Sequence, residues 1–363
     1  MIRKGKGGNW VVKEILIIRL SSIGDVVHCT PVARSIKIAW PDCKITWLIG
    51  AVSADIIKYN SDVDEIIIWS REKFEKHLQD LELEKAWEMW KNLRVQLAAR
   101  RFYAVLDIHG LFLTGMIAKL VNTDRRIGMS KAKELNPLFM TETGAPCGPH
   151  ITDKYLGVLG PLGIDSIDHQ MVLTLGEQEK SFAEDFLRRE GIAPCEKFIV
   201  VIPGTTWPSK NLPIDLFAKT IQILSKDFRI VMCGGKGELE SGQQIQQLSG
   251  MPLVNAVGKT SLLEMAALIA RGAAVISGDT GPLHIAAALK TPTVAVFGPT
   301  NPATYAPRGA GNAVLLHKQD CSFCHKMKCP KGHNLCMTSI TPQAIAEEVY
   351  RIPALNFCRT RIE

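Results

Sequence analysis

Short runs of Val, Ile and Leu alternate with longer amphipathic segments along most of the chain. Such runs are typical of parallel strands buried on both faces, and the longer segments have the length of connecting helices. The predicted strands are Ile15–Leu20, Lys44–Ile49, Glu65–Trp69, Tyr103–Ile108, Phe198–Ile202, Arg229–Cys233, Leu253–Val257, Ala273–Ser277 and Thr293–Phe297. The predicted helices include 26–40, a charged segment over 71–100, Ile214–Ser225 and Leu262–Ala270. The pattern predicts an α/β protein with two tandem doubly wound units.

Glycine, proline and polar residues mark a join between the two units, at Gly160–Gly163 and Gly176–Lys180. We therefore predict domains over 1–170 and 171–345, with a C-terminal tail over 346–363. Ligands of such sheets bind at the carboxyl ends of the strands. We expect the two domains to face each other across a cleft that holds the active site.

Length and composition agree with this organisation. A chain of 363 residues exceeds the usual size of one hydrophobic core, and 46% hydrophobic with 22% charged residues is ordinary for a globular protein. The sequence contains no uninterrupted apolar run long enough to span a membrane, and its beginning lacks the apolar stretch of a signal peptide. We expect a cytoplasmic protein, which disfavours a secreted two-lobed solute-binding protein.

The net charge is +7, and part of it comes from Arg3, Lys4, Lys6 and Lys13. A basic balance favours phosphates, an acidic membrane surface or nucleic acid as partners. A merely solvated basic surface explains it equally well. The basic residues are not interleaved with aromatic residues, which disfavours nucleic acid.

The first candidate loop, 21–25, follows a predicted strand and contains Asp25. Asp25 stands at the start of a helix, where it either caps the helix or faces a ligand. The loop has a single glycine, so it lacks the G-x-G-x-x-G fingerprint of a nicotinamide dehydrogenase.

The second candidate loop, 203–210, places Thr205, Thr206 and Lys210 after a strand, a set that suits a phosphate. An ordinary exposed lysine is the alternative. Glu238 follows a glycine-rich turn after another strand; it either holds a ribose diol or favours the helix dipole.

The third candidate loop, 277–284, is the most specific. Pro282 suits the first position of a helix, so the amides of Leu283 and His284 are expected to point outward at its positive end, where a diphosphate binds. Asp279 would repel a phosphate, so we expect it to accept hydrogen bonds from sugar hydroxyls. His284 is either a ligand or a packed histidine.

Four of the ten cysteines form the pattern C-x₂-C-x₄-C-x₆-C, with His325 and His333 between them. Thiolates in this pattern suit structural zinc or an iron–sulfur site. The C-x-x-C-H pattern of haem attachment is discounted because haem attachment needs export, and disulfides are rare in the cytosol. Packed free thiols are the preferred interpretation, with zinc as the alternative. The cysteines are Cys321, Cys324, Cys329 and Cys336.

Taken together, the segments IIRLSSIGDVVHCTPV, VIPGTTWPSKNLP and AVISGDTGPLHIAAALKTPTVAVFGPT resemble the ADP-heptose:lipopolysaccharide heptosyltransferase family, glycosyltransferase family 9. The resemblance implies the two-domain GT-B fold, with the donor bound by the C-terminal domain. It implies an inverting transfer of heptose from ADP-L-glycero-D-manno-heptose onto the inner core of lipopolysaccharide. The acceptor would be of the lipid A–Kdo type, so the enzyme would contact the inner membrane surface peripherally.

The resemblance also assigns roles to residues. Asp25 becomes the general base, and Arg125 and Arg126 become acceptor-binding residues. The donor would be held by Thr205, Thr206, Lys210, Glu238, Asp279, Thr280, Gly281 and His284. Lys210 and the helix start would stabilise the leaving diphosphate, so no cofactor or metal is required. The alternatives are another nucleotide-sugar enzyme of this architecture, such as an epimerase, or a non-enzymatic two-lobed sugar-binding protein.

Overall fold

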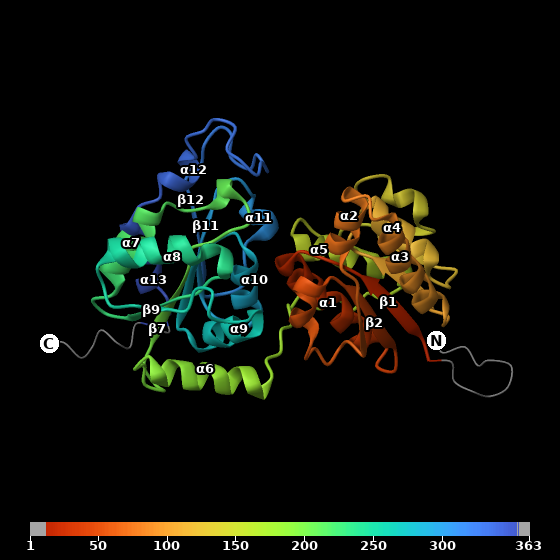
Figure 1. Ribbon diagram of the computed structural model, residues 1–363, viewed down its shortest axis with the longest axis horizontal. Coiled ribbons are helices and arrows are strands. Elements are labelled where there is room, and N and C mark those ends of the chain that lie inside the picture. The colour runs from red at the N-terminus through yellow and green to blue at the C-terminus, as the bar shows by residue number, and fades with distance from the viewer. Residues whose placement is uncertain (1–11, 354, 356–363) are drawn as a thin grey trace. The chain divides into compact units, whose positions relative to one another are not determined.

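The computed structural model describes residues 12–353 and 355, and the chain divides into two compact units between Thr174 and Leu175 (Figure 1). Among the described residues, no helix is long and apolar enough to cross a membrane. Arg3, Lys4 and Lys6, which the charge argument invoked, lie outside the described residues.

The first unit contains a six-stranded parallel sheet in the order β3-β2-β1-β4-β5-β6. Its strands are β1 (Glu14–Ile18), β2 (Lys44–Ile49), β3 (Glu65–Ile68), β4 (Ala104–Asp107), β5 (Arg126–Met129) and β6 (Glu142–Gly144). Its helices are α1 (Ile23–Ala39), η1 (Ala51–Ile57), α2 (Arg71–Gln79), α3 (Leu83–Ala98), α4 (Phe112–Leu120), η2 (Asn136–Phe139), α5 (Ile151–Leu156) and η3 (Gly157–Leu162).

Alternation along the strands gives this sheet two apolar faces. Leu16 and Ile18 of β1 are fully buried and pack in one cluster with Leu93 and Leu97 of α3 and Ile117 of α4. The fully buried residues between them, such as Ile17, point to the opposite face. The prediction of one charged helix over 71–100 is wrong, because this segment forms two helices, α2 and α3. The helix ends because Leu81, between them, takes a left-handed backbone conformation with φ 58°.

The second unit repeats the architecture, with parallel strands in the order β12-β11-β10-β7-β8-β9. Its strands are β7 (Phe198–Ile202), β8 (Arg229–Met232), β9 (Val254–Asn255), β10 (Ala274–Gly278), β11 (Thr293–Phe297) and β12 (Asn312–Leu316). Its helices are α6 (Glu177–Arg189), η4 (Pro208–Lys210), α7 (Ile214–Leu224), η5 (Lys236–Glu238), α8 (Leu239–Ser249), α9 (Leu262–Arg271), α10 (Gly281–Ala288), α11 (Pro302–Tyr305), α12 (Leu335–Thr338) and α13 (Pro342–Tyr350).

Helix α13 crosses the predicted boundary at residue 345. Ile345, Ala346, Val349 and Ile352 are buried in the same core cluster as strand β7 and helix α7. This part of the predicted tail therefore belongs to the second unit. The reason is visible in the sequence, because the apolar residues of this segment recur at helical spacing.

Each sheet reverses its strand order once. In the first unit the reversal lies between β1 and β4, and in the second unit between β7 and β10. In sheets of this type, ligands bind outside the carboxyl ends of the strands at such a reversal. The loops after β1, β4, β7 and β10 are therefore the places to look for a site in each unit.

Candidate active site

Asp25 lies in the first turn of α1, directly after β1. Its Oδ2 accepts hydrogen bonds from the Arg19 guanidinium at 2.6 Å and from the Ser22 hydroxyl at 2.9 Å. Its Oδ1 accepts from the Tyr155 hydroxyl at 2.6 Å. The Ser22 amide also donates to Asp25 at 3.4 Å, which is a long contact for a helix cap. Helix capping is thus a minor part of what this carboxylate does.

These partners determine the charge state of Asp25. Burial acts to raise the pKa of the carboxyl, but the charge of Arg19 and the hydrogen bonds from Tyr155 and Ser22 outweigh it. The net result is a pKa well below the usual range, so Asp25 is ionised throughout the physiological pH range. Its side chain is 29% exposed, which leaves the carboxylate within reach of a ligand.

The structure brings two further polar side chains to this edge of the sheet. His109 follows β4, and its Nδ1 accepts a hydrogen bond from the Leu20 amide at 3.3 Å. Burial, together with the positive charges of Arg19 and Arg71, lowers the pKa of His109 to about 3, so the imidazole is neutral. Arg71 Nη1, from the start of α2, lies 3.5 Å from His109 Nε2. Sequence reasoning missed both residues, although His109 directly follows a predicted strand and Arg71 stands two residues after another.

In the second unit, Asp279 is the centre of a buried polar cluster. Its Oδ2 accepts from Lys210 Nζ at 2.7 Å and from the Thr300 hydroxyl at 2.6 Å. Its Oδ1 lies 3.3 Å from His284 Nε2. The cluster joins the loops after β7, β10 and β11. Thr300 was not predicted, although it stands in the F-G-P-T segment that the resemblance rests on.

The charged groups of the Asp279 cluster are paired with one another. Burial acts to raise the pKa of Asp279, but His284 and then Lys210 outweigh it, and the pKa lies well below the usual range. The Asp279 side chain is only 6% exposed. It therefore holds Lys210 and His284 in place, and the expectation that it accepts hydrogen bonds from sugar hydroxyls gains no support from this geometry. The Lys210 ammonium also lies 4.5 Å from the centre of the Trp207 ring.

Close glycine contacts show how tightly the loops after β7, β8 and β10 meet. A Cβ on Gly204 would lie 2.2 Å from Cγ of Glu238, and a Cβ on Gly278 would lie 3.2 Å from Cγ2 of Thr205. The Glu238 side chain therefore packs against the loop after β7. The Thr205 hydroxyl is already engaged, at 2.6 Å from Asn211 Oδ1.

Helix α10 begins at Gly281, and Thr280 is its N-cap residue. The prediction that the Leu283 amide is free is wrong, because this amide donates to the Thr280 carbonyl at 3.1 Å. The first turn is tighter than an α-helical turn. Pro282 has no N–H, so the amide of Gly281 is the donor at the very start of the helix. In the β7 loop, Thr206 is exposed.

Arg125 and Arg126 lie at the amino end of β5, the edge of the sheet opposite to Asp25. Arg125 forms two hydrogen bonds to the Glu142 carboxylate, both at 2.8 Å, and one to the Pro161 carbonyl at 2.7 Å. Arg126 Nε donates to the Phe139 carbonyl at 2.9 Å. Both guanidinium groups hold the fold together here, and this placement does not favour an acceptor-binding role.

The sequence model of glycosyltransferase family 9 (heptosyltransferase) matches residues 90–335, more than half of the chain. The chain belongs to glycosyltransferase family 9. It is therefore a glycosyltransferase enzyme, as the resemblance of its loops implies.

Relatives of this glycosyltransferase extend along both units. The lipopolysaccharide core heptosyltransferase OpsX of Haemophilus influenzae is 25% identical over 315 residues, covering 85% of this chain and 86% of OpsX. A family 9 glycosyl transferase from Veillonella parvula has a TM-score of 0.82 at 23% identity, covering 94% of this chain and 97% of that one. E. coli heptosyltransferase WaaC with ADP-2-deoxy-2-fluoro heptose has a TM-score of 0.69 at 24% identity, covering 93% of this chain and 98% of WaaC. The predicted GT-B fold class is confirmed.

The cysteine-rich segment 321–336 of this glycosyltransferase packs against the loops after β7 and β11. The Ser209 amide donates to the Met327 carbonyl at 3.1 Å, and the Ser209 hydroxyl donates to the Lys326 carbonyl at 2.6 Å. The Phe323 amide donates to the Gly298 carbonyl at 3.0 Å. The segment thus supports both neighbours of the Asp279 cluster, the β7 loop and the β11 loop.

The four thiols of this segment differ in environment. Burial raises the pKa of Cys336, and the other three thiols add to the effect. Backbone amides, that of Asn334 foremost, lower the pKa of Cys329. Across residues 12–353 and 355, no group of three or more His, Cys, Asp or Glu side chains is arranged to hold a metal ion.

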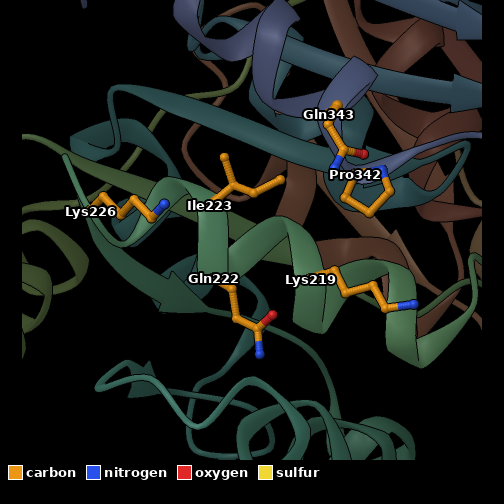
Figure 2. A pocket seen from close by; sticks show the side chains of 6 residues that line it. All are labelled: Lys219, Gln222, Ile223, Lys226, Pro342 and Gln343. Carbon is orange, nitrogen blue, oxygen red and sulfur yellow. The ribbon is translucent and has the colours of Figure 1, made fainter.

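A surface pocket in the second unit lies apart from these loops (Figure 2). It is formed by the second half of α7, which leads toward the amino end of β8, and by the start of α13. Its lining residues are Lys219, Gln222, Ile223, Lys226, Pro342 and Gln343. None of them belongs to the strand-end loops, so the pocket is not part of the candidate site.

Proposed function

We propose that this enzyme transfers a heptose, with inversion, from ADP-L-glycero-D-manno-heptose to the inner core of lipopolysaccharide. One observation carries the proposal. A partly buried cation, Lys210, is held at the strand reversal of one unit, and an ionised, partly exposed carboxylate, Asp25, is held at the reversal of the other. The first suits a diphosphate leaving group, and the second suits an acceptor hydroxyl. The relatives named as lipopolysaccharide heptosyltransferases supply the substrate class.

The donor side works through fixed positive charge. Lys210 and the amide at the start of α10 bind the diphosphate, and Asp279 keeps the Lys210 ammonium in one place. Charge that is positioned before the reaction stabilises the departing ADP without reorganisation. Thr206 and the α10 start residues Thr280 and Gly281 contact the phosphates or the heptose, and Glu238 faces the ribose.

The acceptor side works through Asp25. The acceptor oxygen forms a bond to the anomeric carbon on the face opposite the diphosphate. The bond from that carbon to the diphosphate oxygen breaks, and ADP leaves with the electron pair. Because its pKa is held low, Asp25 is a weak base, so the acceptor proton moves to it only as the acceptor oxygen becomes positively charged in the transition state.

The surroundings of Asp25 favour an acidic acceptor. Arg71 and Arg19 lie at the same edge of the sheet, and His109 between them is neutral. A carboxylate or phosphate on the acceptor sugar suits Arg71, whose only described ion pair is with Glu75 on its own helix. This chemistry supports a Kdo-containing lipid A core as the acceptor, and we propose that the enzyme works at the cytoplasmic membrane surface.

We propose a structural role for the cysteine-rich segment, with its thiols free. Its contacts with Ser209 and Gly298 support the loops that hold Lys210 and Thr300. Elemental analysis of protein purified without chelators tests this. A stoichiometric amount of zinc or iron would overturn the free-thiol proposal and establish a bound metal.

The proposed reaction is tested with a panel of donors. Purified enzyme is incubated with ADP-heptose, or with UDP- and GDP-sugars, together with defined lipopolysaccharide cores. The expected product is the core carrying one added heptosyl unit, formed only from ADP-heptose, with the anomeric configuration inverted by NMR. Transfer from another nucleotide sugar, or isomerisation of the donor without an acceptor, would overturn the proposal.

A further inference from the structure

The first unit exposes an apolar patch beside the Asp25 edge. It consists of Phe112 at the start of α4 and of Leu135 and Leu138 in the loop over 130–139, here called the 130–139 loop. Leu135 is 66% exposed and Leu138 is 75% exposed. Isolated exposed leucines are common, whereas apolar side chains exposed close together are typical of interaction surfaces.

The 130–139 loop is firmly anchored. Asn136 is fully buried, and its amide nitrogen donates to Asp107 Oδ2 at 2.7 Å and to the Leu111 carbonyl at 2.8 Å. The Lys133 amide donates to the Gly110 carbonyl at 3.1 Å. The exposed leucines therefore do not result from a loosely attached segment.

Local conformation directs the apolar side chains outward. Glu134 and Leu135 both adopt left-handed backbone conformations, with φ of 53° and 58°. Glu134 is also used locally, since its carboxylate accepts from the Phe112 amide at 3.3 Å. Left-handed backbone conformations are unfavourable for residues other than glycine, asparagine and aspartate. The contacts around Glu134 and Leu135 therefore hold the backbone in these conformations.

The charge next to the patch has a basic excess, since Lys131 and Lys133 outnumber the carboxylate of Glu134. Lys131 and Lys133 are both exposed, and among the described residues neither forms an ion pair. Apolar side chains that protrude beside lysines match the interface of a bilayer containing anionic lipids. Gly110, to which the loop is anchored, directly follows His109, so the patch adjoins the edge of the sheet where Asp25 lies.

We propose that Phe112, Leu135 and Leu138, with Lys131 and Lys133, form a docking surface for an anionic lipid bilayer. The proposal rests on the proposed function in one respect: a lipid-linked acceptor is delivered at a membrane. The surface holds the acceptor edge of the first unit at the height of the headgroups, where the core sugars of the acceptor begin.

The turn between α2 and α3 is the competing surface. It also exposes apolar side chains, with Leu81 at 80% and Leu83 at 61%. Its neighbours Asp80, Glu82 and Glu84 are acidic, which opposes binding to an anionic surface. This turn therefore supplies a matched control.

The test is co-sedimentation of the full chain with vesicles of phosphatidylethanolamine and phosphatidylglycerol, without donor or acceptor. The double variant Leu135→Ser/Leu138→Ser is expected to lower the partition coefficient about tenfold or more, because two interfacial leucines are lost. Lys131→Glu/Lys133→Glu is expected to lower it about tenfold on these vesicles and to have little effect on neutral phosphatidylcholine vesicles. The control Leu81→Ser/Leu83→Ser is expected to bind as the wild type does.

Circular dichroism establishes that each variant is folded, and transfer to a soluble, delipidated core separates membrane docking from catalysis. Loss of vesicle binding with normal transfer to the soluble core supports the proposal. Normal vesicle binding by both 130–139 loop variants, or loss only in the α2–α3 control, overturns it. Failure of heptosyl transfer by the wild type overturns the proposed function and leaves the vesicle result standing on its own.

Discussion

The Tyr155 hydroxyl donates a hydrogen bond of 2.6 Å to Asp25 Oδ1, although 130 residues separate the two in sequence. Helix α5 thus completes the environment that the loop after β1 begins. Together with Arg19, Tyr155 keeps the carboxylate ionised and fixes the orientation of its plane.

Replacing Tyr155 by Phe removes this bond and keeps the ring. In the wild type, the pKa of Asp25 is depressed below its unfolded value. The ionised carboxylate therefore contributes fully to folding stability above about pH 4, and this contribution is lost as the pH falls further. In Tyr155→Phe the pKa of Asp25 rises, and the acid limb of the pH–rate profile moves to higher pH. Transfer rates measured from acidic to neutral pH check this. An unchanged acid limb would show that Tyr155 does not act on Asp25.

Lys210→Ala is expected to weaken binding of ADP but not of adenosine. Loss of one charge-assisted hydrogen bond to the diphosphate costs about 1.5–3 kcal/mol, roughly 10- to 150-fold in affinity. The matched control is Lys219→Ala, whose ammonium is exposed and pairs with Asp215 on the surface of α7. Isothermal calorimetry with both ligands measures the difference. Equal losses for ADP and adenosine would rule out a phosphate-binding role.

Thr300→Val preserves shape and deletes the hydroxyl that donates to Asp279 at 2.6 Å. The variant is expected to be less stable by about 1–3 kcal/mol, because a buried carboxylate loses a donor. It should also raise the KM for the donor, since Asp279 orients Lys210. Denaturant unfolding and donor titration check both effects, with exposed Thr338→Val as the control. Wild-type stability of Thr300→Val would contradict the claim that the Thr300 hydroxyl stabilises the buried Asp279 carboxylate.

The periodicity of apolar residues and the loops at the strand ends predicted much of the architecture. Strands β2, β7 and β11 were predicted with the bounds that the structure has, because buried parallel strands are continuous apolar runs. Strands β5, β6 and β12 were not predicted. Each is only partly buried, so none has the continuous apolar run that marks a central strand.

The partners within the site were beyond the reach of the sequence. Asp25, Lys210 and Asp279 stood out because each follows a strand, which is a local property. The contacts of Tyr155 with Asp25 and of Thr300 with Asp279 depend on how helices and loops pack, and no local pattern encodes them. The Arg125 prediction shows the converse. The resemblance assigned Arg125 to a ligand, whereas its pairing with Glu142 at the amino end of β5 favours a structural role.

Arg125→Ala is accordingly expected to lower stability and leave the acceptor KM unchanged. The Glu142 ion pair is partly exposed, so the loss in unfolding free energy should be modest, about 1 kcal/mol. Thermal unfolding and acceptor titration measure the two quantities. Arg71→Ala provides the contrast, since it should raise the acceptor KM with little effect on stability. A higher acceptor KM in Arg125→Ala would restore the acceptor-binding role.

The most direct test of the central claim is to compare heptosyl transfer by the wild type and by Asp25→Asn, measured as added mass on the lipopolysaccharide core, alongside ADP binding by calorimetry. The wild type is expected to add one heptosyl unit from ADP-heptose. Asp25→Asn is expected to bind ADP with wild-type affinity and to transfer about 10²–10⁴-fold more slowly, as loss of a general base requires. Near-native transfer by Asp25→Asn would contradict the account.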